Sequence, residues 1–396
     1  MWKKLKVGIL FGGKSAEHEV SLQSARNVFD ALDRHKYNPV LIGINKNGQW
    51  LLGNASRFLL NTDDPKKIRL DASLNPALDQ VTLAPESRGE LSNIAAMGRE
   101  AAAIGVIATP EELTRSLTAR LPVQSVDVVF PILHGPFGED GTVQGLLKLA
   151  DIPFVGAGVL SSAAGMDKDV MKRLFRDAGL PIGKFRAIKS HGKIPDFNEV
   201  TAELGCPVFI KPANMGSSVG VSKARNASEY LAAVSEAFRF DTKILLEEFI
   251  PGRELECSVL GNEEPRASVV GEVKSTHEFY SYDAKYIDEN GAVLEIPAGI
   301  SAACSDRVRK LAIRAFSALE CEGLSRVDFF LKNNSMEPDG FEIIVNEINT
   351  MPGFTKISMY PKLWEASGVS YSELIDELIQ LALKRFEKEK KLRTSV

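Results

Sequence analysis

The chain has 396 residues, and its 48 Lys and Arg against 52 Asp and Glu give a formal net charge of −4. That balance offers no bulk attraction to nucleic acid or to an anionic membrane surface. Hydrophobic residues make up 44% and charged residues 25%, as in a soluble globular protein, and the length predicts two or three domains.

The sequence contains no recognisable targeting or membrane-spanning segment. The apolar run that follows the basic residues 1–6 ends at residue 11, which is too short for a signal peptide, and no stretch approaches transmembrane length. The four cysteines are widely spaced and form no CxxC pair, which favours reduced cysteines over a structural metal site. We therefore expect a cytoplasmic protein with no nucleic-acid or membrane partner.

The start of the chain predicts a parallel α/β domain. Residues 5–11 have the composition of a buried strand, residues 15–32 have the periodicity of a helix, and residues 38–44 predict a second strand. The glycine pair at 12–13 lets the chain turn where the first strand ends, so that the amide-rich N-terminus of the helix faces a ligand. Glu17, in the first helical turn, either offsets the helix dipole or binds a ligand amine.

The segment from Gly8 to Ser15 matches the P-loop pattern GxxxxGKS. In a P-loop the spacer is a loop whose amides cradle phosphate. Here the spacer is ILFG (9–12), and its three large apolar residues belong to the predicted strand. We therefore favour a simple turn at the end of the strand, and a nucleotide switch or kinase built on Lys14 is the competing hypothesis.

A second loop in the first domain has the composition of a binding loop. Residues 70–120 have weak patterning and predict an insertion, with some helix around residues 91–103 but no chemistry. Residues 126–133 then predict a buried strand that runs into the glycine-rich HGPFGEDG (134–141). His134 is either a ligand contact or a hydrogen-bonded structural residue. We expect the first domain to span residues 1–155.

The central part of the chain predicts a phosphate-binding loop. Residues 161–178 predict one helix that carries Lys168, and residues 204–212 predict a strand that carries Lys211. The next segment, ANMGSSVGV (213–221), offers amides and hydroxyls beside this lysine, which suits a cover for phosphate groups. An ordinary turn is the alternative origin of such a glycine- and serine-rich loop.

The composition of the second half of the chain predicts a domain boundary and a lid. A strand at residues 243–249 ends in a turn that predicts a hinge between a central domain at 156–250 and a C-terminal domain at 251–396. Residues 274–290 are polar and rich in tyrosine, which predicts a lid over a site more than it predicts a core element.

The segment around residue 340 predicts a metal site on a hairpin. Residues 326–331 and 341–349 have the composition of two strands joined by a polar turn, and pairing them brings Asp328 close to Glu347 and Asn349. These are oxygen ligands of the kind that Mg²⁺ prefers. Because the flanking residues are apolar, carboxylates here would be costly without a cation. A solvated polar face of the hairpin is the alternative.

Taken together, the motifs resemble the ATP-grasp superfamily and, within it, the D-alanine–D-alanine ligase family. They span almost the whole chain in the order that the family has. The matching segments are GGKSAEHEVSL (12–22), HGPFGEDGTVQG (134–145), MDK (166–168), FIKPANMGSSVGVSK (209–223), LLEEFIPGRELE (245–256), FYSYDAKY (279–286), SRVDFF (325–330) and VNEINTMPGFTKIS (345–358).

The resemblance implies an α/β fold, with an α+β C-terminal half, in the three-domain ATP-grasp architecture. It implies a ligase that phosphorylates the carboxylate of one D-alanine with ATP. The amine of a second D-alanine then attacks the acyl phosphate, giving D-alanyl-D-alanine, ADP and phosphate for peptidoglycan synthesis. It further implies two Mg²⁺ (or Mn²⁺) ions and a homodimer. Residues 70–120 look longer than the family needs.

The resemblance also implies a role for each matching residue. The metal ligands are Asp328, Glu347 and Asn349. The ATP contacts are Lys168, Lys211, Gly216, Ser217, Ser218, Glu247, Glu248, Phe249, Ile250, Glu254 and, in the lid, Lys285. The substrate contacts are Glu17, His134, Arg326 and Ser358. The groups that stabilise the tetrahedral intermediate are Arg326 and the amide of Gly353. The hydrogen-bonded set that links the three domains on closure is Glu17, Ser217 and Tyr286.

Tyr286 bears on the choice of acceptor. Relatives that make D-alanyl-D-lactate lack the FYxYxAKY arrangement or have Phe at this position, so the resemblance implies a D-alanine acceptor. Another ATP-grasp carboxylate ligase, such as a D-alanine–D-lactate ligase, is the alternative among enzymes. A non-catalytic amino-acid-binding protein that uses the α/β domain is a further alternative, and the Asp328, Glu347 and Asn349 set argues against it.

Overall fold

The computed structural model describes residues 3–53, 79–83, 88, 90–93, 122–275, 292–337 and 340–393. The chain forms two compact units. The first comprises Met1–Gly138, Val143–Val155 and Ile375–Val396, and the second comprises Glu139–Thr142 and Gly156–Leu374. In the ranges given above, no helix has both the length and the apolar character needed to cross a membrane.

The first unit is built on a seven-stranded sheet in the order β6-β5-β4-β3-β2-β1-β7. Its strands are β1 (Leu5–Gly12), β2 (Tyr37–Ile44), β3 (Trp50–Gly53), β4 (Asp79–Leu83), β5 (Glu90–Asn93), β6 (Pro122–Ser125) and β7 (Val128–Ile132). β1 pairs in parallel with both β2 and β7, whereas the pairings from β2 to β6 are antiparallel. The predicted parallel α/β core is confirmed, and an antiparallel extension continues the sheet beyond β2.

Two predictions for the first unit need correction. Helix α1 spans His18–Ala31 and begins later than the predicted residue 15, because residues 15–17 form a turn in which the Glu17 amide donates to Ser15 Oγ (3.1 Å). In the predicted insertion at residues 70–120, β4 and β5 are strands of the sheet, and β5 includes residues 91–93 that were predicted to be helical. The other residues of that segment lie outside the described ranges.

The first unit is completed by helices that are far apart in the sequence. Helix α5 (Thr142–Leu149) buries Leu147 against the sheet residues Leu10 and Val129. Helix α13 (Tyr371–Glu389) returns from the end of the chain, and its Asp376 accepts a hydrogen bond from the hydroxyl of buried Tyr37 (2.6 Å). The chain end is therefore part of the packing of the first unit.

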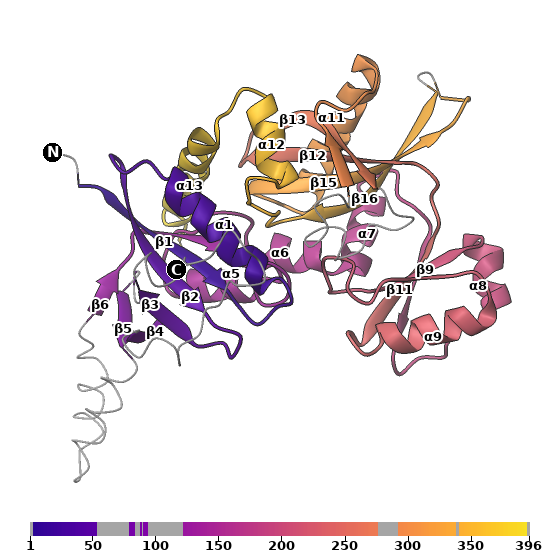
Figure 1. Ribbon diagram of the computed structural model, residues 1–396, viewed down its shortest axis with the longest axis horizontal. Coiled ribbons are helices and arrows are strands. Elements are labelled where there is room, and N and C mark those ends of the chain that lie inside the picture. Colours follow the sequence, from indigo (N-terminus) through magenta and orange to yellow (C-terminus); the bar gives the residue numbers. More distant parts are fainter. Residues whose placement is uncertain are drawn as a thin grey trace, which may run out of the picture. The chain divides into compact units, whose positions relative to one another are not determined.

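The second unit contains a four-stranded antiparallel sheet in the order β10-β9-β11-β8. The strands are β8 (Phe185–Lys189), β9 (Val208–Pro212), β10 (Ser222–Ala224) and β11 (Lys243–Glu248). Helices α8 (Phe197–Leu204) and α9 (Ala227–Ala237) cover one face, as Figure 1 shows. Because side chains alternate along a strand, Ile210 points into this core and Lys211 points to the opposite face.

A five-stranded antiparallel sheet in the order β14-β13-β12-β15-β16 forms the rest of this unit. Its strands are β12 (Arg253–Gly261), β13 (Arg266–Ser275), β14 (Ala292–Glu295), β15 (Gly323–Asn333) and β16 (Phe341–Asn349). Helix α11 (Ala302–Ala318) packs on one face, where Val327 and Phe329 of β15 join its core, and α12 (Met359–Ala366) packs on β12 and β13. Arg326 and Asp328, which alternate with these core residues along β15, face away from α11.

The hairpin of β15 and β16 contains a β-bulge. Asp328 pairs with Glu347, but the next residue, Phe329, pairs with Val345, so one residue of β16 is extra. Val345 and Ile348 both lie in the core although they are three residues apart, which a regular strand does not permit. The bulge thus keeps Glu347 on the face of Asp328 while Val345 remains buried.

The single helix predicted at residues 161–178 is two helices in the structure. Helix α6 (Val159–Met166) ends and α7 (Lys168–Asp177) begins at Asp167, whose backbone is extended. The Asp167 carboxylate accepts from the Val170 amide (3.1 Å), so it caps α7. The prediction missed this break because both segments are rich in helix-forming residues and Asp167 provides the only signal between them.

The turn after β1 provides a test of backbone constraint. Gly12 and Gly13 both have positive φ angles, but a Cβ on Gly12 would lie 2.2 Å from the Ile44 carbonyl oxygen, whereas the nearest atom to one on Gly13 is a Leu133 methyl at 3.6 Å. We expect Gly12→Ala to lower the free energy of unfolding by about 3 kcal/mol, and Gly13→Ala by about 1 kcal/mol, in urea titrations. Equal losses for the two variants would contradict the role of the close contact.

Candidate active site

Two loops of the first unit meet at the carboxyl ends of β1 and β7. These strands are parallel neighbours, so the chain leaves both at the same edge of the sheet. Ser24 Oγ of α1 lies 3.4 Å from His134 Nε2, and a Cβ on Gly135 would lie 2.9 Å from Glu17 Oε2. The structure therefore brings the predicted residues Glu17 and His134 into one buried region, although 117 positions separate them in the sequence.

His18 is a further residue of this region that the sequence did not single out. Its Nδ1 lies 2.7 Å from the carbonyl oxygen of Gly13, and the ring is buried. Burial lowers the pKa of His18, and the hydrogen bond to Gly13 only partly offsets this effect. A neutral imidazole therefore fixes the turn that precedes Glu17. Lys14, the lysine of the competing P-loop hypothesis, is exposed at this turn and the spacer before it lies in β1.

In the second unit, the buried carboxylate of Glu247 lies between the buried Lys172 and the largely buried Lys211. Glu247 Oε2 is 2.7 Å from Lys211 Nζ, and Glu247 Oε1 is 3.3 Å from Lys172 Nζ. Burial lowers the pKa of Lys172 even in the presence of Glu247. Burial is the largest effect on Lys211 and would lower its pKa, but the charge and hydrogen bond of Glu247, together with the charges of Glu347 and Glu254, raise that pKa overall. The predicted residues Lys211 and Glu247 are thus in contact, and Lys172, which was not predicted as a site residue, lies beside them.

Aromatic and basic side chains share the same face of this sheet. The rings of Phe209 and Phe249 have centroids 6.0 Å apart, and Lys223 Nζ lies 4.5 Å from the Phe249 centroid. Phe249 is 40% exposed, and its neighbour Glu248 accepts a hydrogen bond from the Lys184 amide (2.6 Å). An exposed ring next to backbone at a strand end can stack on a planar base.

The loop between β9 and β10 has two consecutive serines in the left-handed region, with φ angles of 50° at Ser217 and 60° at Ser218. This conformation is unfavourable for residues with a Cβ and is often retained at ligand sites. Lys168 Nζ donates to the Met215 carbonyl in this loop (2.7 Å) and lies 4.0 Å from Glu347 Oε2 on β16. Lys168 thereby connects the loop to the metal-ligand candidate on the other sheet.

Charged side chains from three neighbouring strands meet on the five-stranded sheet. Arg326 donates to both oxygens of Asp328, from Nε and from Nη2, at 2.7 Å each. Arg326 Nε also lies 2.8 Å from Glu256 Oε2, and Asn349 Nδ2 donates to Asp328 Oδ2 (2.9 Å). Burial alone would lower the pKa of Arg326, but Asp328 and Glu256 raise it well above its ordinary value. Glu256 was not predicted as a site residue.

A turn after β16 brings together the predicted residues Gly353 and Ser358. Ser358 Oγ accepts from the Thr355 amide (3.0 Å), and a Cβ on Gly353 would lie 2.9 Å from the same oxygen. A side chain at position 353 would therefore displace the hydroxyl of Ser358. Glu254 lies at the start of β12, on the strand that carries Glu256. The remaining predicted residues, Lys285 and Tyr286, lie outside the described ranges.

The donor set on β15 and β16 has the chemistry that a divalent cation requires. Two carboxylates, Asp328 and Glu347, face each other in register, and the amide of Asn349 is next to them. These are hard oxygen donors suited to Mg²⁺. Within the described part of the chain, no group of three or more His, Cys, Asp or Glu side chains is arranged to hold a metal. The candidate set contains only two such residues and depends on an amide for the third ligand.

The fold and site together define the class of the protein. Two antiparallel sheets of the second unit, one carrying lysines and the other carrying carboxylates, are those of an ATP-grasp enzyme, and they accompany an α/β unit. A family model described as the D-ala D-ala ligase N-terminus matches residues 6–157, and one described as the D-ala D-ala ligase C-terminus matches residues 174–380. The chain belongs to the D-alanine–D-alanine ligase family.

Individual relatives are similar over their whole length. The D-alanine–D-alanine ligase of Oceanobacillus iheyensis is 51% identical over 99% of both chains, and D-alanine–D-alanine ligase A of Escherichia coli K12 is 48% identical over 100% of both. Among solved structures, the D-alanine–D-alanine ligase from Coxiella burnetii has a TM-score of 0.80 at 34% identity, covering 98% of this chain and 97% of that one. The VanG D-Ala:D-Ser ligase from Enterococcus faecalis has a TM-score of 0.78 at 36% identity, covering 96% and 100%.

The paired lysines predict how stability depends on pH. Burial alone would raise the pKa of Glu247, but Lys172 and Lys211 lower it to about 2, from an ordinary value of 4.5. The charged form is therefore favoured by folding, and its contribution is complete above pH 4.5 and is lost as the pH falls toward 2. We expect Glu247→Gln to lower the free energy of unfolding by about 3 kcal/mol at pH 7. The difference from the parent chain should shrink between pH 4.5 and 2.

Urea titrations of both chains at pH 7 and at two acidic values measure this difference. A difference between the chains that stays constant across the acidic range would show that Glu247 is not the titrating group.

Proposed function

We propose that this chain joins two D-alanines in an ATP-dependent ligase reaction and so produces D-alanyl-D-alanine for peptidoglycan synthesis. The observation that carries the proposal is the set of charges in the second unit, where Lys168 approaches Glu347 and Arg326 holds Asp328. Membership of the ligase family and full-length similarity to D-alanine–D-alanine ligases support the same reaction.

The chemistry explains why so many cations are needed. A carboxylate oxygen of the first D-alanine attacks the γ-phosphorus of ATP, and ADP leaves with the electrons of the broken bond. Two anions approach each other in this step, so positive charge must offset their repulsion. Lys168, Lys211 and the amides of Gly216, Ser217 and Ser218 hold the phosphates in our proposal, and Lys285 completes the set.

The second step forms the amide bond. The amine of the second D-alanine attacks the carbonyl carbon of the acyl phosphate, an oxyanion develops, and phosphate leaves as the carbonyl re-forms. We assign Arg326 and the Gly353 amide to this oxyanion, and Ser358 to the carboxylate of the second D-alanine. Glu17 binds the ammonium group of the first, with His134 nearby. We assign Glu17, Ser217 and Tyr286 to the hydrogen-bonded set that the family resemblance implies for the closed enzyme.

We assign the nucleotide base and sugar to the end of β11 and the turn after it, starting at Glu247. Backbone groups from Glu247 to Ile250 hold adenine, Phe249 packs against it, and Glu254 binds the ribose hydroxyls. Asp328, Glu347 and Asn349 would hold two Mg²⁺ (or Mn²⁺) ions, and bound ions would supply positive charge to neutralise the phosphates. We further propose that the protein acts in the cytoplasm as a homodimer, the oligomeric state that the family resemblance implies.

The direct test measures phosphate release from ATP and Mg²⁺ with D-alanine, with L-alanine, or with D-alanine plus D-lactate or D-serine. We expect release with D-alanine alone and D-alanyl-D-alanine as the product by mass. D-serine is included because of the similarity to a D-Ala:D-Ser ligase. A preference for D-lactate or D-serine over D-alanine at neutral pH would contradict the acceptor that Tyr286 predicts. Folded protein that binds ATP without any release would contradict the reaction.

Two lysine variants separate the ligase from the P-loop hypothesis. Lys211→Ala removes a cation held in the buried site, and we expect kcat/KM to fall by more than about 100-fold, because Glu247 is left beside only one lysine. Lys14→Ala removes an exposed side chain, and we expect a change below about twofold. The reverse ranking would favour a nucleotide site at the turn after β1.

The metal assignment is tested on the hairpin. We expect Asp328→Asn to weaken Mn²⁺ binding to the ADP complex by about tenfold or more, since one hard anionic donor is lost. Titration followed by electron paramagnetic resonance measures this binding without turnover. Glu342→Gln is the matched control, because Glu342 lies on β16 of the same hairpin and pairs with Lys332 where both side chains are exposed. Equal binding by both variants would refute the assignment.

A further inference from the structure

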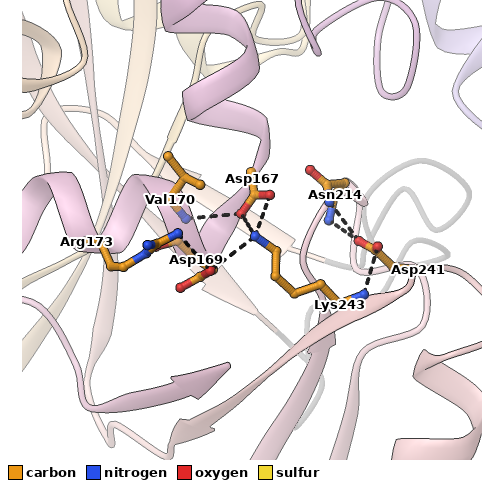
Figure 2. Close-up of polar contacts among 7 residues, drawn as sticks. All are labelled: Asp167, Asp169, Val170, Arg173, Asn214, Asp241 and Lys243. Atoms are coloured by element: carbon orange, nitrogen blue, oxygen red, sulfur yellow. Dashed lines mark hydrogen bonds and ion pairs between the residues drawn. The ribbon is translucent and has the colours of Figure 1, made fainter. Parts of the chain in front are cut away.

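A second cluster of charges lies behind the lysine that starts helix α7. Lys243, the first residue of β11, donates from Nζ to Asp167 (2.7 Å) and to Asp169 (3.1 Å), as Figure 2 shows. All three side chains are at most 19% exposed. Burial would lower the pKa of Lys243, but its hydrogen bonds to Asp167 and Asp169 raise it. Lys243 therefore stays charged in a largely buried position.

Both carboxylates that Lys243 contacts belong to the start of α7. Asp167 caps the helix through the Val170 amide, and Asp169, in the first turn, also accepts from Arg173 Nη2 (3.1 Å). Lys168 lies between the two. The ammonium group of Lys243 thus fixes the residues on each side of Lys168 and leaves the Lys168 side chain directed to Met215 and Glu347.

Backbone hydrogen bonds also connect the start of α7 to the start of β11, through Ala213. The Lys168 amide donates to the Ala213 carbonyl (3.0 Å), and the Ala213 amide donates to the Lys243 carbonyl (3.0 Å). Asp241, two residues before Lys243, accepts from both the backbone amide (2.7 Å) and the side chain (2.9 Å) of Asn214. The start of β11 therefore holds both the first turn of α7 and the first residues of the loop that contains Ser217.

We propose that Lys243 is a positioning residue for nucleotide binding, which fixes Lys168 and the 213–221 loop relative to strand β11. The proposal rests on the proposed function, in which Lys168 and this loop bind the phosphates of ATP. Lys243 itself does not touch the nucleotide. It acts by holding the Asp167 cap and Asp169 in place, so that Lys168 and the loop are ordered before the nucleotide arrives.

Three variants and one control test this role. Lys243→Met keeps the length of the side chain and removes its charge, whereas Lys243→Arg keeps the charge. Asp167→Asn keeps an acceptor for the Val170 amide and removes the charge that Lys243 contacts. Lys189→Met is the matched control, because Lys189 is the register partner of Lys243 on β8 and is exposed.

The primary readout is the dissociation constant of Mg-ADP, measured by calorimetry without D-alanine. We expect Lys243→Met and Asp167→Asn each to weaken ADP binding by about tenfold, with Lys243→Arg restoring most of it and Lys189→Met unchanged. The KM for ATP should rise in parallel while the KM for D-alanine stays within about twofold. Combining Lys243→Met with Asp167→Asn should add little, since both remove the same contact.

Unchanged ADP binding in Lys243→Met or in Asp167→Asn would overturn the proposal. So would a loss of the same size in Lys189→Met, or parallel rises in the KM values of ATP and D-alanine, because these would indicate a general effect on folding. Should Lys243→Met fail to fold, Asp167→Asn and Lys243→Arg decide the question. A parent chain that binds ADP but releases no phosphate with D-alanine would refute the proposed function alone, because the ADP measurements do not depend on turnover.

Discussion

Burial of two lysine side chains around one carboxylate is the constraint on which the second unit depends. A desolvated ammonium group is unstable alone, so Lys172 and Lys211 require Glu247, and Glu247 requires them. These residues come from α7, β9 and β11, and their contact therefore fixes a helix against a sheet as well as setting charge. The same contact keeps Lys211 cationic, which is the state that its proposed role in phosphate binding requires. Under that proposal, one set of atoms contributes both to stability and to function.

In both sheets of this unit, strand alternation places apolar side chains on one face and charged side chains on the other. On β9 and β11 one face packs under α8 and α9, and on β12 and β15 one face packs under α11, while the alternate residues carry the charges. Each buried row fixes the strand register, and the register fixes which charged side chains are neighbours. Arg326 meets Asp328 and Glu256 for this reason. Precision at the site thus comes from apolar packing on the opposite face.

Local patterns predicted the strands well, and they predicted which residues share a face. The pairing of Asp328 with Glu347 followed from the predicted hairpin. The proximity of Glu17 and His134 did not follow from local pattern, because it depends on β1 and β7 being neighbours in the sheet, and only the family resemblance implied a shared role for the two residues. The bulge on β16 was not predictable from local pattern, because it arises from the packing of both Val345 and Ile348 in the core. The break at Asp167 was missed as well, since its cause includes Lys243, 76 residues away. Contacts of this range leave no local periodicity.

Helix α13 has a consequence for synthesis of the chain. Its residues Leu378 and Ile379 are fully buried in the first unit, and Arg385 donates to the Phe154 carbonyl (2.8 Å). Residues from the two ends of the sequence thus share one core. A ribosome releases the N-terminal strands first, but their packing partners emerge only after the whole second unit has been made. The second unit can fold while translation continues, whereas part of the apolar surface of the first unit stays uncovered until α13 has been made.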